Sequence, residues 1–442
     1  MKTLALKTKG NTAMKFTAVG DILCQRRMAE DYEGFSTVKD FIEQGDARFF
    51  NLETTVNYEG ECYGNQFSGG TYIRCEPEVV SDMLKFGFNL TTFNNNHVMD
   101  FAHDGLIKTI EYVNELGIVH GGVGMNLHEA SSPAYLDTKN GRVALIAVNT
   151  SFLAPLMAGE QSRRLPGRPG INGLTVSRRV ILPKEDFEKI KEIGEKTKIN
   201  DPKNVTRAEG YYPYPPDDVA ELGDMEFQLG DDYGLKYEIS KKDMERFESA
   251  IHDAKMRADY VMVSVHSHQL VGTDKTAVPD FLRDFAHHCI DIGADAVVGH
   301  GPHLLRPVEV YKDKPIFYSL GDFVIQLYDV KVAPEDFYKK YGMNSDSSAI
   351  ALLEKRSNGF TRGLMEDVRM RETVVPFWEC DENKKLTKLV MLPVTAAKGT
   401  GYHLEGLPQP SLDTSFVEKF AEMSKPYGVE MKLENGLIHC KW

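Results

Sequence analysis

The sequence predicts an α/β protein in which buried strands alternate with amphipathic helices. Short apolar runs end in polar or glycine-rich turns, helical periodicity follows them, and most runs are apolar throughout, as in strands covered on both faces. The 442 residues are 42% hydrophobic and 26% charged, which excludes wholesale disorder. This length supports a large core in one α/β domain with insertions, or in two or three average domains.

The first third of the chain begins this alternation. Strands are predicted at residues 14–20, 47–52, 87–93 and 142–148. Helices are predicted at residues 37–43, 78–86 and 104–116. In the third helix, apolar residues recur at helical spacing and Gly117 supplies the C-terminal stop.

The second half of the chain continues the alternation of predicted strands and ends in a predicted helix. Strands are predicted at residues 260–265, 294–298, 315–318 and 386–392, and a helix at residues 415–424. We expect residues 1–395 to form the core and residues 396–442 to be a C-terminal extension that braces it.

The pattern breaks over residues 155–237. This stretch is rich in Arg, Pro, Tyr and Asp and contains one predicted helix, at residues 185–196. A long segment with little periodic structure is predicted to be a loop-rich insertion that acts as a lid or substrate-binding segment. The alternative is a surface decoration, and Tyr211, Tyr212 and Tyr214 fit an aromatic wall or a packed loop equally well.

Charge and the N-terminus restrict the function and the location. A formal charge of −13 argues against nucleic-acid binding, because a phosphate backbone is captured on a basic surface. No apolar run has the length of an export signal or a membrane span, so we expect a cytoplasmic protein.

The six cysteines form no CxxC pair; free thiols are favoured, and a Cys62–Cys75 disulfide is the alternative. No feature of the sequence sets the oligomeric state.

Side chains that can bind metals follow the predicted strands at the points where those strands end. Carboxyl ends of strands meet at one edge of an α/β sheet, so these side chains are predicted to converge there. The predicted ligands are Asp21, Glu53, Asn96, His266, His300 and His303, with His268 as a possible accessory. Imidazoles, an amide and carboxylates without cysteine favour one or two divalent ions, Mn, Fe or Zn, with one carboxylate able to bridge.

Six segments, in this order, carry a resemblance to a known family: VGDILC, NLETTV, NNNHVMD, VSVHSH, GHGPH and YSLGDF. Together they resemble the bacterial CapA family, also called the poly-γ-glutamate capsule biosynthesis family, within the calcineurin-like metallophosphoesterase superfamily. The resemblance covers residues 15–324 and implies a four-layer α-β-β-α sandwich with its metal site at one edge. It also implies that Asp21 is the first-motif aspartate and that Glu53 stands at the bridging position.

The chain departs from the family pattern at three points. The usual Asp-x-His motif reads Asp21-Ile22-Leu23, so one site loses a ligand. The string after His266 reads Ser-His-Gln-Leu rather than Trp-Gly-x-Glu. The final Gly-Asn-Phe motif carries Asp322 in place of asparagine; we favour a turn cap for this carboxylate, and added negative charge near the site is the alternative.

The leading functional hypothesis is a metal-dependent hydrolase of a small anionic substrate, a phosphoester, with water activated by the metal. His97, oriented by Asp100, is the predicted general acid; the alternative for Asp100 is an N-cap of the next helix. Predicted substrate-binding residues are Arg74, Arg163, Arg164 and Arg168, with a solvated basic face as the alternative.

Two rival functions remain open. The family name suggests hydrolysis or transfer at γ-glutamyl amide bonds in capsule metabolism. The missing first-motif histidine suggests a non-catalytic binding protein with a vestigial metal site.

Overall fold

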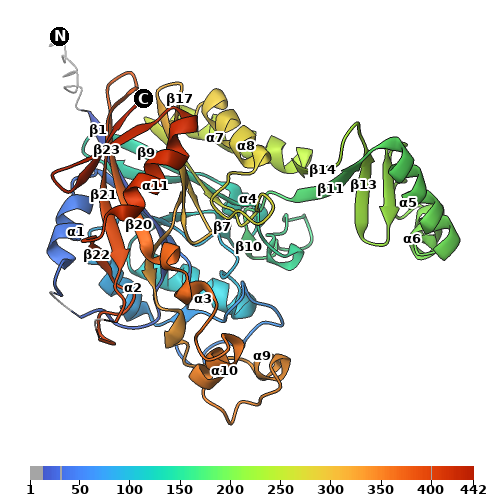
Figure 1. The fold of residues 1–442 in the computed structure, drawn as a ribbon, viewed down its shortest axis with the longest axis horizontal. Coiled ribbons are helices and arrows are strands. Elements are labelled where there is room, and N and C mark those ends of the chain that lie inside the picture. The colour runs from blue at the N-terminus through green and yellow to red at the C-terminus, as the bar shows by residue number, and fades with distance from the viewer. Residues whose placement is uncertain (1–12, 30–31, 400) are drawn as a thin grey trace. The chain divides into compact units, whose positions relative to one another are not determined.

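The computed structural model describes residues 13–29, 32–399 and 401–442, which divide into two compact units (Figure 1). The larger unit contains the described residues up to Gly173 and from Glu245 onward, and the smaller unit is Leu174–Met244. Both units mix helices and strands, so the predicted α/β class is confirmed.

A ten-stranded sheet contains both the first strands and the last strands of the chain. Its order is β23 (Glu430–Glu434), β24 (Leu437–Lys441), β21 (Leu386–Ala396), β20 (Glu372–Cys380), β1 (Met14–Leu23), β2 (Ala47–Leu52), β5 (Leu90–Thr92) and β6 (Val119–Gly121). β19 (Asp322–Ile325) pairs with β1, and β22 (Pro408–Pro410) pairs with β21. From β1 to β6 the strands are parallel, so their carboxyl ends lie at one edge.

A six-stranded sheet forms the second half of the larger unit. Its order is β17 (Leu305–Tyr311), β18 (Lys314–Leu320), β16 (Ala296–His300), β15 (Tyr260–His266), β9 (Gly141–Asn149) and β8 (Ala134–Thr138). The four inner strands are parallel and the two edge strands are antiparallel.

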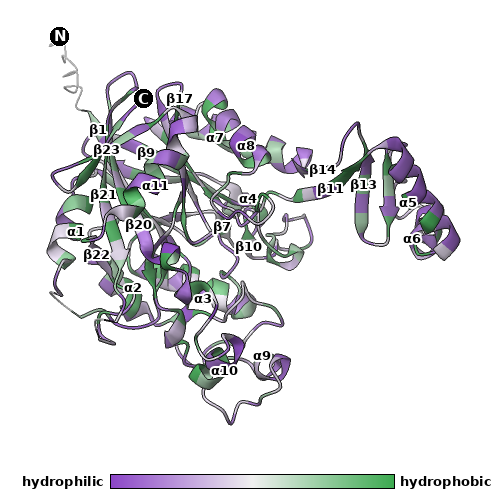
Figure 2. Ribbon diagram, in the orientation of Figure 1, coloured by the Kyte–Doolittle hydropathy of each residue, from purple (hydrophilic) through white to green (hydrophobic). Residues whose placement is uncertain are grey.

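The two sheets share one apolar core. Phe16 of β1 stacks on Trp378 of β20 with ring centroids 5.1 Å apart, and Phe317 of β18 packs against the same indole at 5.3 Å. Figure 2 shows hydrophobic stretches among the strands near the labels β1 and β21. Side chains of β1 point to both faces of its sheet. Phe16 and Ala18 enter this core, whereas Val19 and, beyond an irregularity in the strand register, Ile22 enter the core beneath the helices.

Helices cover the outer faces of the sheets. α1 (Phe35–Ile42), α2 (Pro77–Leu84) and α3 (Ala102–Glu115) share an apolar cluster with the ten-stranded sheet. α8 (Asp280–Ile292) contacts β16 and packs against α7 (Lys241–Arg257) through Phe285 and Phe247, and α11 (Ser415–Ser424) packs on β17.

Shorter elements complete the larger unit. They are β3 (Thr55–Val56), β4 (Arg74–Cys75), β7 (Val123–Gly124), β10 (Gly170–Ile171), α4 (Leu127–Ser131), α9 (Glu335–Lys340) and α10 (Ala349–Arg356). Short 3₁₀ helices lie at Ala154–Leu156, Leu327–Asp329, Leu364–Glu366, Val368–Arg371 and Lys425–Tyr427.

The smaller unit has regular structure of its own. Its sheet has the order β12 (Val219–Leu222), β13 (Met225–Leu229), β11 (Val176–Leu182) and β14 (Gly234–Ile239), and its helices are α5 (Lys184–Thr197) and α6 (Asp201–Ala208). The prediction of a loop-rich insertion is therefore wrong over this range. The small core around Phe187 and Phe227 covers part of one sheet face, so charged residues interrupt the strands and hide their apolar pattern.

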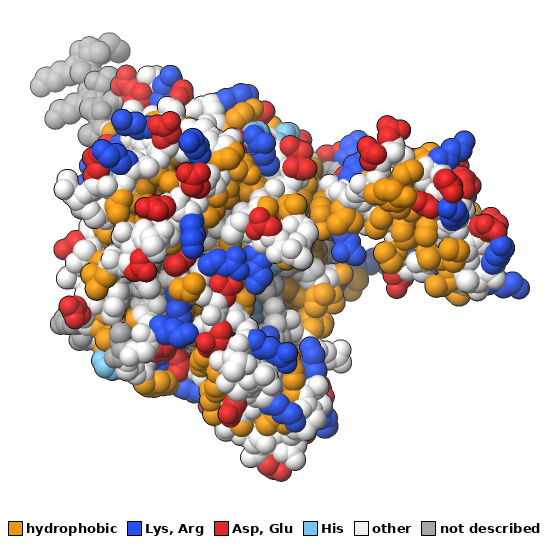
Figure 3. Space-filling model, viewed as in Figure 1, with side chains coloured by type: hydrophobic (Ala, Val, Ile, Leu, Met, Phe, Trp, Pro, Cys, Tyr) orange, Lys and Arg blue, Asp and Glu red, His pale blue; other side chains and the backbone are white. Residues whose placement is uncertain are grey.

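Three general properties follow from the described residues. Among them, no helix is both long and apolar enough to cross a bilayer. All six cysteines are free thiols, so the alternative Cys62–Cys75 disulfide is not formed. The face in Figure 3 carries Lys and Arg side chains interspersed with Asp and Glu.

Candidate metal centre

The predicted metal ligands come together where strands of the two sheets end. Asp21, Glu53 and Asn96 come from β1 and from the segments after β2 and β5. His266 and His300 end β15 and β16, and His268 and His303 follow them. Nitrogen and oxygen atoms of these side chains form three groups, each within 4.8 Å: Asp21–His266–His300, Glu53–His268–His303 and Asp21–His303–Asp322.

Strand register places the histidines. His266 and His300 are partners on neighbouring parallel strands, so both rings project from the same face, and their Nδ1 atoms lie 2.8 Å apart. His266 Nε2 lies 2.7 Å from Asn96 Oδ1 and 3.0 Å from His268 Nε2. On its other side His300 Nε2 is 2.7 Å from the Ser264 hydroxyl, which fixes the ring orientation.

Three carboxyl groups line the other side of the centre. Asp21 accepts hydrogen bonds from the Asn51 side-chain amide at 2.6 Å and from the Gly301 backbone N–H at 3.0 Å. His303 Nδ1 lies 2.9 Å from Asp322 Oδ1 and 4.0 Å from Glu53 Oε2. The Glu53 carboxyl thus stands between His303 and His266, whose Nε2 is 3.7 Å from the other Glu53 oxygen.

Burial without partners is the observation that fits a cation. Both Glu53 oxygens and Asp322 Oδ2 are buried and have no hydrogen-bond partner. Such orphaned oxygens carry a large desolvation cost, which a bound divalent ion removes. The donor set of carboxylate, imidazole and amide groups suits Mn, Fe or Zn, so the residues present fit the group that the sequence predicts.

The same burial shifts the protonation equilibria. It raises the pKa of Asp21 to about 6, and raises the pKa of Glu53 and Asp322 well above the usual carboxyl range. It lowers the pKa of His300 to about 3 and the pKa of His266 and His268 well below the usual imidazole value. The imidazoles are therefore neutral at physiological pH, which is the form that binds metals.

The backbone at the centre is unusually tight. His303 has φ of +63°, a left-handed conformation that non-glycine residues rarely adopt and that clusters at functional sites. A Cβ at Gly20 would lie 1.9 Å from the Gly321 carbonyl oxygen, so only glycine allows β1 and the Gly321 turn to approach this closely.

His97 and Asp100 form a separate buried pair beside the centre. His97 Nδ1 lies 2.7 Å from Asp100 Oδ2, and Asp100 also accepts hydrogen bonds from the Gly69 and Ile73 amides. A Cβ at Gly69 would lie 2.7 Å from His97 Nε2, so only glycine lets this loop pack so closely against that nitrogen. Asp100 is not the N-cap of α3: the capping residue is Phe101, and no side chain caps the helix.

The centre is more accessible on one side than on the other. Asn96 and His268 are half-buried, whereas the remaining predicted ligands are buried. The accessible surface of the centre therefore lies on the side of Asn96 and His268.

The predicted arginines lie in other settings. Arg74 is buried, donates to the Asn57 carbonyl and pairs with Glu59 and Glu76. Arg168 is exposed and donates to the Met157 carbonyl, and Arg163 and Arg164 are also exposed. The structure does not bring these four side chains together as one cluster with the metal ligands.

Sequence reasoning missed three residues of the centre. Asp322, interpreted as a turn cap, contacts His303 instead and belongs to one of the three groups of possible ligands. Asn51 and Ser264 hold Asp21 and His300 in place. The signal for Asp322 was its position just after the buried strand β18, the same signal that identified Asp21. Asn51 and Ser264 lie within strands and gave no such signal.

The fold and the site define a mixed α/β protein with a buried centre of histidines and carboxyl groups at the ends of two sheets. The sequence profile of the family described as "Bacterial capsule synthesis protein PGA_cap" matches residues 15–327. The chain belongs to this CapA family of capsule synthesis proteins.

Individual relatives extend the comparison. The uncharacterized protein y4sH of Sinorhizobium fredii is 31% identical over 98% of this chain and 94% of its own. The capsule biosynthesis protein CapA of Bacillus anthracis is 24% identical over 72% of this chain and 61% of its own. The PGA biosynthesis protein CapA of Bacillus subtilis is 24% identical over 73% and 66%. A crystal structure of a hypothetical protein from Thermus thermophilus is 12% identical over 86% of this chain and 98% of that chain, with a TM-score of 0.36.

Proposed function

We propose that the protein is a metal-dependent hydrolase of a small anionic substrate, a phosphoester. The observation that carries this proposal is the convergence of imidazole nitrogens on buried carboxyl oxygens that have no other partner, above all those of Glu53. In this proposal the two packed sheets and their covering helices form the four-layer sandwich of the metallophosphoesterase type.

The ligand assignment follows the geometry. Asp21, Asp322, His303 and one Glu53 oxygen would hold one cation, while the other Glu53 oxygen, Asn96, His266 and His268 would hold a second. His300, which forms a group of possible ligands with Asp21 and His266, would supply a further nitrogen to the centre through its Nδ1. Asp322 makes up for the carboxyl or imidazole ligand that Leu23 cannot supply, because Leu23 is buried in an apolar cluster with Ile73 and Ile325. When bound, such ions act as Lewis acids and lower the pKa of bound water.

The His97–Asp100 pair provides the proton for the leaving group. Asp100 accepts from His97 Nδ1 and so directs Nε2 towards Gly69; in the doubly protonated ring, Nε2 carries the proton that the leaving group would receive. Two backbone amides hold Asp100 itself, which makes the orientation of the ring rigid. The role of residues 155–237 as a substrate-binding segment stays a prediction.

A second candidate is hydrolysis or transfer at γ-glutamyl amide bonds. It is favoured by the names of two relatives, the capsule biosynthesis and PGA biosynthesis proteins CapA of Bacillus. The same centre would serve it, since an amide carbonyl is polarised in the same way as a phosphoryl oxygen.

The deciding experiment measures metal content first and turnover second. Protein purified without chelator is expected to contain one or two Mn, Fe or Zn ions per chain, and His300→Ala is expected to lose metal and turnover. His128→Ala is the matched control, because His128 is exposed. A panel of phosphoesters and γ-glutamyl peptides, each with Mn²⁺, then separates the two candidates.

Three outcomes would overturn parts of the proposal. Protein that stays metal-free after reconstitution refutes both enzymatic functions. Metal and turnover that survive His300→Ala show that the centre lies elsewhere. Bound metal without turnover of either substrate class supports a non-catalytic binding protein.

A further inference from the structure

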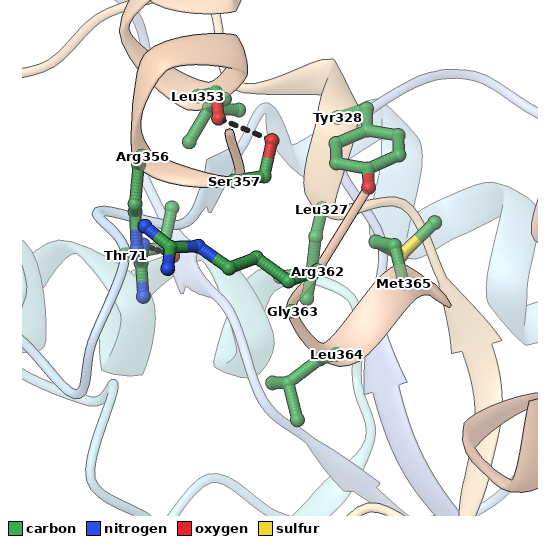
Figure 4. A pocket seen from close by; sticks show the side chains of 10 residues that line it. All are labelled: Thr71, Leu327, Tyr328, Leu353, Arg356, Ser357, Arg362, Gly363, Leu364 and Met365. Carbon is green, nitrogen blue, oxygen red and sulfur yellow. Dashed lines mark hydrogen bonds between the residues drawn. The ribbon is translucent and has the colours of Figure 1, made fainter. Parts of the chain in front are cut away.

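A second polar feature lies in the larger unit, in the segment that follows β19. A cavity of about 300 Å³ is lined by Thr71, Leu327, Tyr328, Leu353, Arg356, Ser357, Arg362, Gly363, Leu364 and Met365 (Figure 4). Leucine, methionine and tyrosine side chains form most of its wall. Arg362 extends across the opening towards Arg356 and Thr71 (Figure 4). The cavity therefore combines an apolar body with two guanidinium groups at one end.

Neither arginine has an acidic partner among the described residues. Arg356 donates to the Thr71 hydroxyl at 2.5 Å and lies over the Phe337 ring, and within the described part of the chain neither guanidinium forms an ion pair. Glu366, the nearest acid in sequence to Arg362 on its C-terminal side, accepts from Tyr328 and pairs with Lys398. In a chain with 65 acidic and 52 basic residues, two converging arginines left without a carboxylate indicate a site for an external anion.

A short loop connects this cavity to the proposed active site. The Gly69 carbonyl accepts from the Asn96 side-chain amide, and the Gly69 and Ile73 amides donate to Asp100. Thr71, which binds Arg356, is the middle residue of that loop. Two residues of chain span at most about 7 Å, so a ligand at Arg356 lies close to the loop that holds Asn96 and Asp100.

We propose that this cavity binds an anionic head group, carboxylate or phosphate, carried on a short aliphatic body. Both oxygens of such a head group match the planar fork of a guanidinium, and the aliphatic part matches the leucine and methionine wall. Resting on the proposed function, we assign the cavity to a part of the substrate remote from the bond that is attacked. The substrate is then longer than a single phosphoester group and has a second anionic centre.

Binding is tested on metal-free protein, so that the metal centre does not contribute. The probes are n-butyl phosphate and adipate, with inorganic phosphate to test the aliphatic requirement, each titrated by calorimetry at low ionic strength. We expect one site per chain for at least one aliphatic probe. The preferred probe tells whether the head group is a phosphate or a carboxylate, and inorganic phosphate is expected to bind roughly tenfold more weakly.

Three variants locate the binding. Arg362→Gln is expected to lower the affinity for the preferred probe roughly tenfold or more, because it removes a charged donor to the head group. The variant is expected to fold, since the Arg362 side chain is exposed. Arg356→Lys keeps the positive charge but loses the planar guanidinium that can bind two oxygens of the head group. It is expected to weaken binding less than Arg356→Gln, which removes both. Lys425→Gln, which removes an equal charge from an exposed position, is the matched control and is expected to change binding less than twofold. Thermal unfolding checks that each variant is folded.

Several results would overturn the assignment. They are absence of binding by both aliphatic probes, binding that survives Arg362→Gln, and equal weakening by Lys425→Gln. Inorganic phosphate that binds as tightly as n-butyl phosphate refutes the aliphatic part. Binding lost in Arg362→Gln in a protein without any hydrolase activity supports the cavity and contradicts only the proposed function.

Discussion

Asp21 and Asp322 are register partners on the neighbouring parallel strands β1 and β19, and both side chains are fully buried. Like charges so close cannot both ionise readily without a cation, and burial alone already raises the pKa of each carboxyl. His303 links the two, with its Nδ1 2.9 Å from Asp322 and 4.0 Å from Asp21. We regard this carboxyl pair as the feature that most favours the proposed metal site.

The first prediction concerns Asp322. Asp322→Asn keeps an oxygen that accepts from His303 but removes the charge, so Mn²⁺ affinity is expected to fall roughly 10- to 100-fold. The thermal stability of the metal-free protein is expected to stay the same or to rise, because a buried carboxyl has been removed. Calorimetric titration with Mn²⁺ and thermal unfolding measure the two effects. Asp346→Asn, at an exposed position, is the control, and equal affinities of the two variants would contradict a ligand role.

The pH dependence of metal binding is the second prediction. A carboxyl must lose its proton to bind a cation, so affinity is expected to rise with pH through the Asp21 pKa of about 6, by about tenfold per unit for each proton released. It continues to rise above that pH because the pKa values of Glu53 and Asp322 are also raised. The histidines do not change this pH dependence around pH 6, because burial lowers the pKa of His300 to about 3 and its ring is already neutral there. Titrations with Mn²⁺ below, at and above pH 6 in buffers of different ionisation enthalpy report the protons released; proton uptake or a pH-independent affinity would refute the assignment.

Much of the larger unit was predictable because its parallel strands are buried on both faces. β9 and β15 read as uninterrupted apolar runs, and the polar residues directly after such runs had to lie at one edge of a sheet. β20 was missed because Pro376 interrupts its pattern. In the structure the pairing of β20 with β1 ends at Phe377, so the missing amide of Pro376 leaves no gap in that ladder.

Other features depend on contacts between distant segments. Asp322 lies at the centre because β19 pairs with β1, which brings together residues 301 positions apart. No local sequence pattern reports such a pairing. The strands of the smaller unit were hidden because residues such as Arg179 and Lys236 face each other across its exposed side. Arg356 and Arg362 meet at a cavity only because Thr71 lies beside them.

The third prediction separates proton transfer from metal binding. His97→Gln is expected to lower turnover roughly 10²- to 10⁴-fold while the metal content stays unchanged, because His97 is paired with Asp100 and is not part of the three ligand groups. With a substrate that has a good leaving group, such as an activated aryl phosphate, the variant is expected to regain most of the lost rate, because the leaving group then needs no proton. His128→Gln provides the matched control. Loss of metal in His97→Gln, or equal losses with good and poor leaving groups, would show that His97 is not the acid.

The packing between the sheets gives the fourth prediction. Trp378 is fully buried between Phe16 and Phe317, so Trp378→Ala is expected to lower the free energy of unfolding by about 3–5 kcal/mol. Trp378→Phe is expected to cost less, because it retains an aromatic ring and removes the indole N–H, which has no hydrogen-bond partner. The chain's other tryptophan, Trp442, is 45% exposed, and Trp442→Ala is expected to cost less than about 0.5 kcal/mol. Urea unfolding of the three variants in metal-free buffer measures these differences. Equal costs for the two alanine variants would mean that the sheets are not held together through this core.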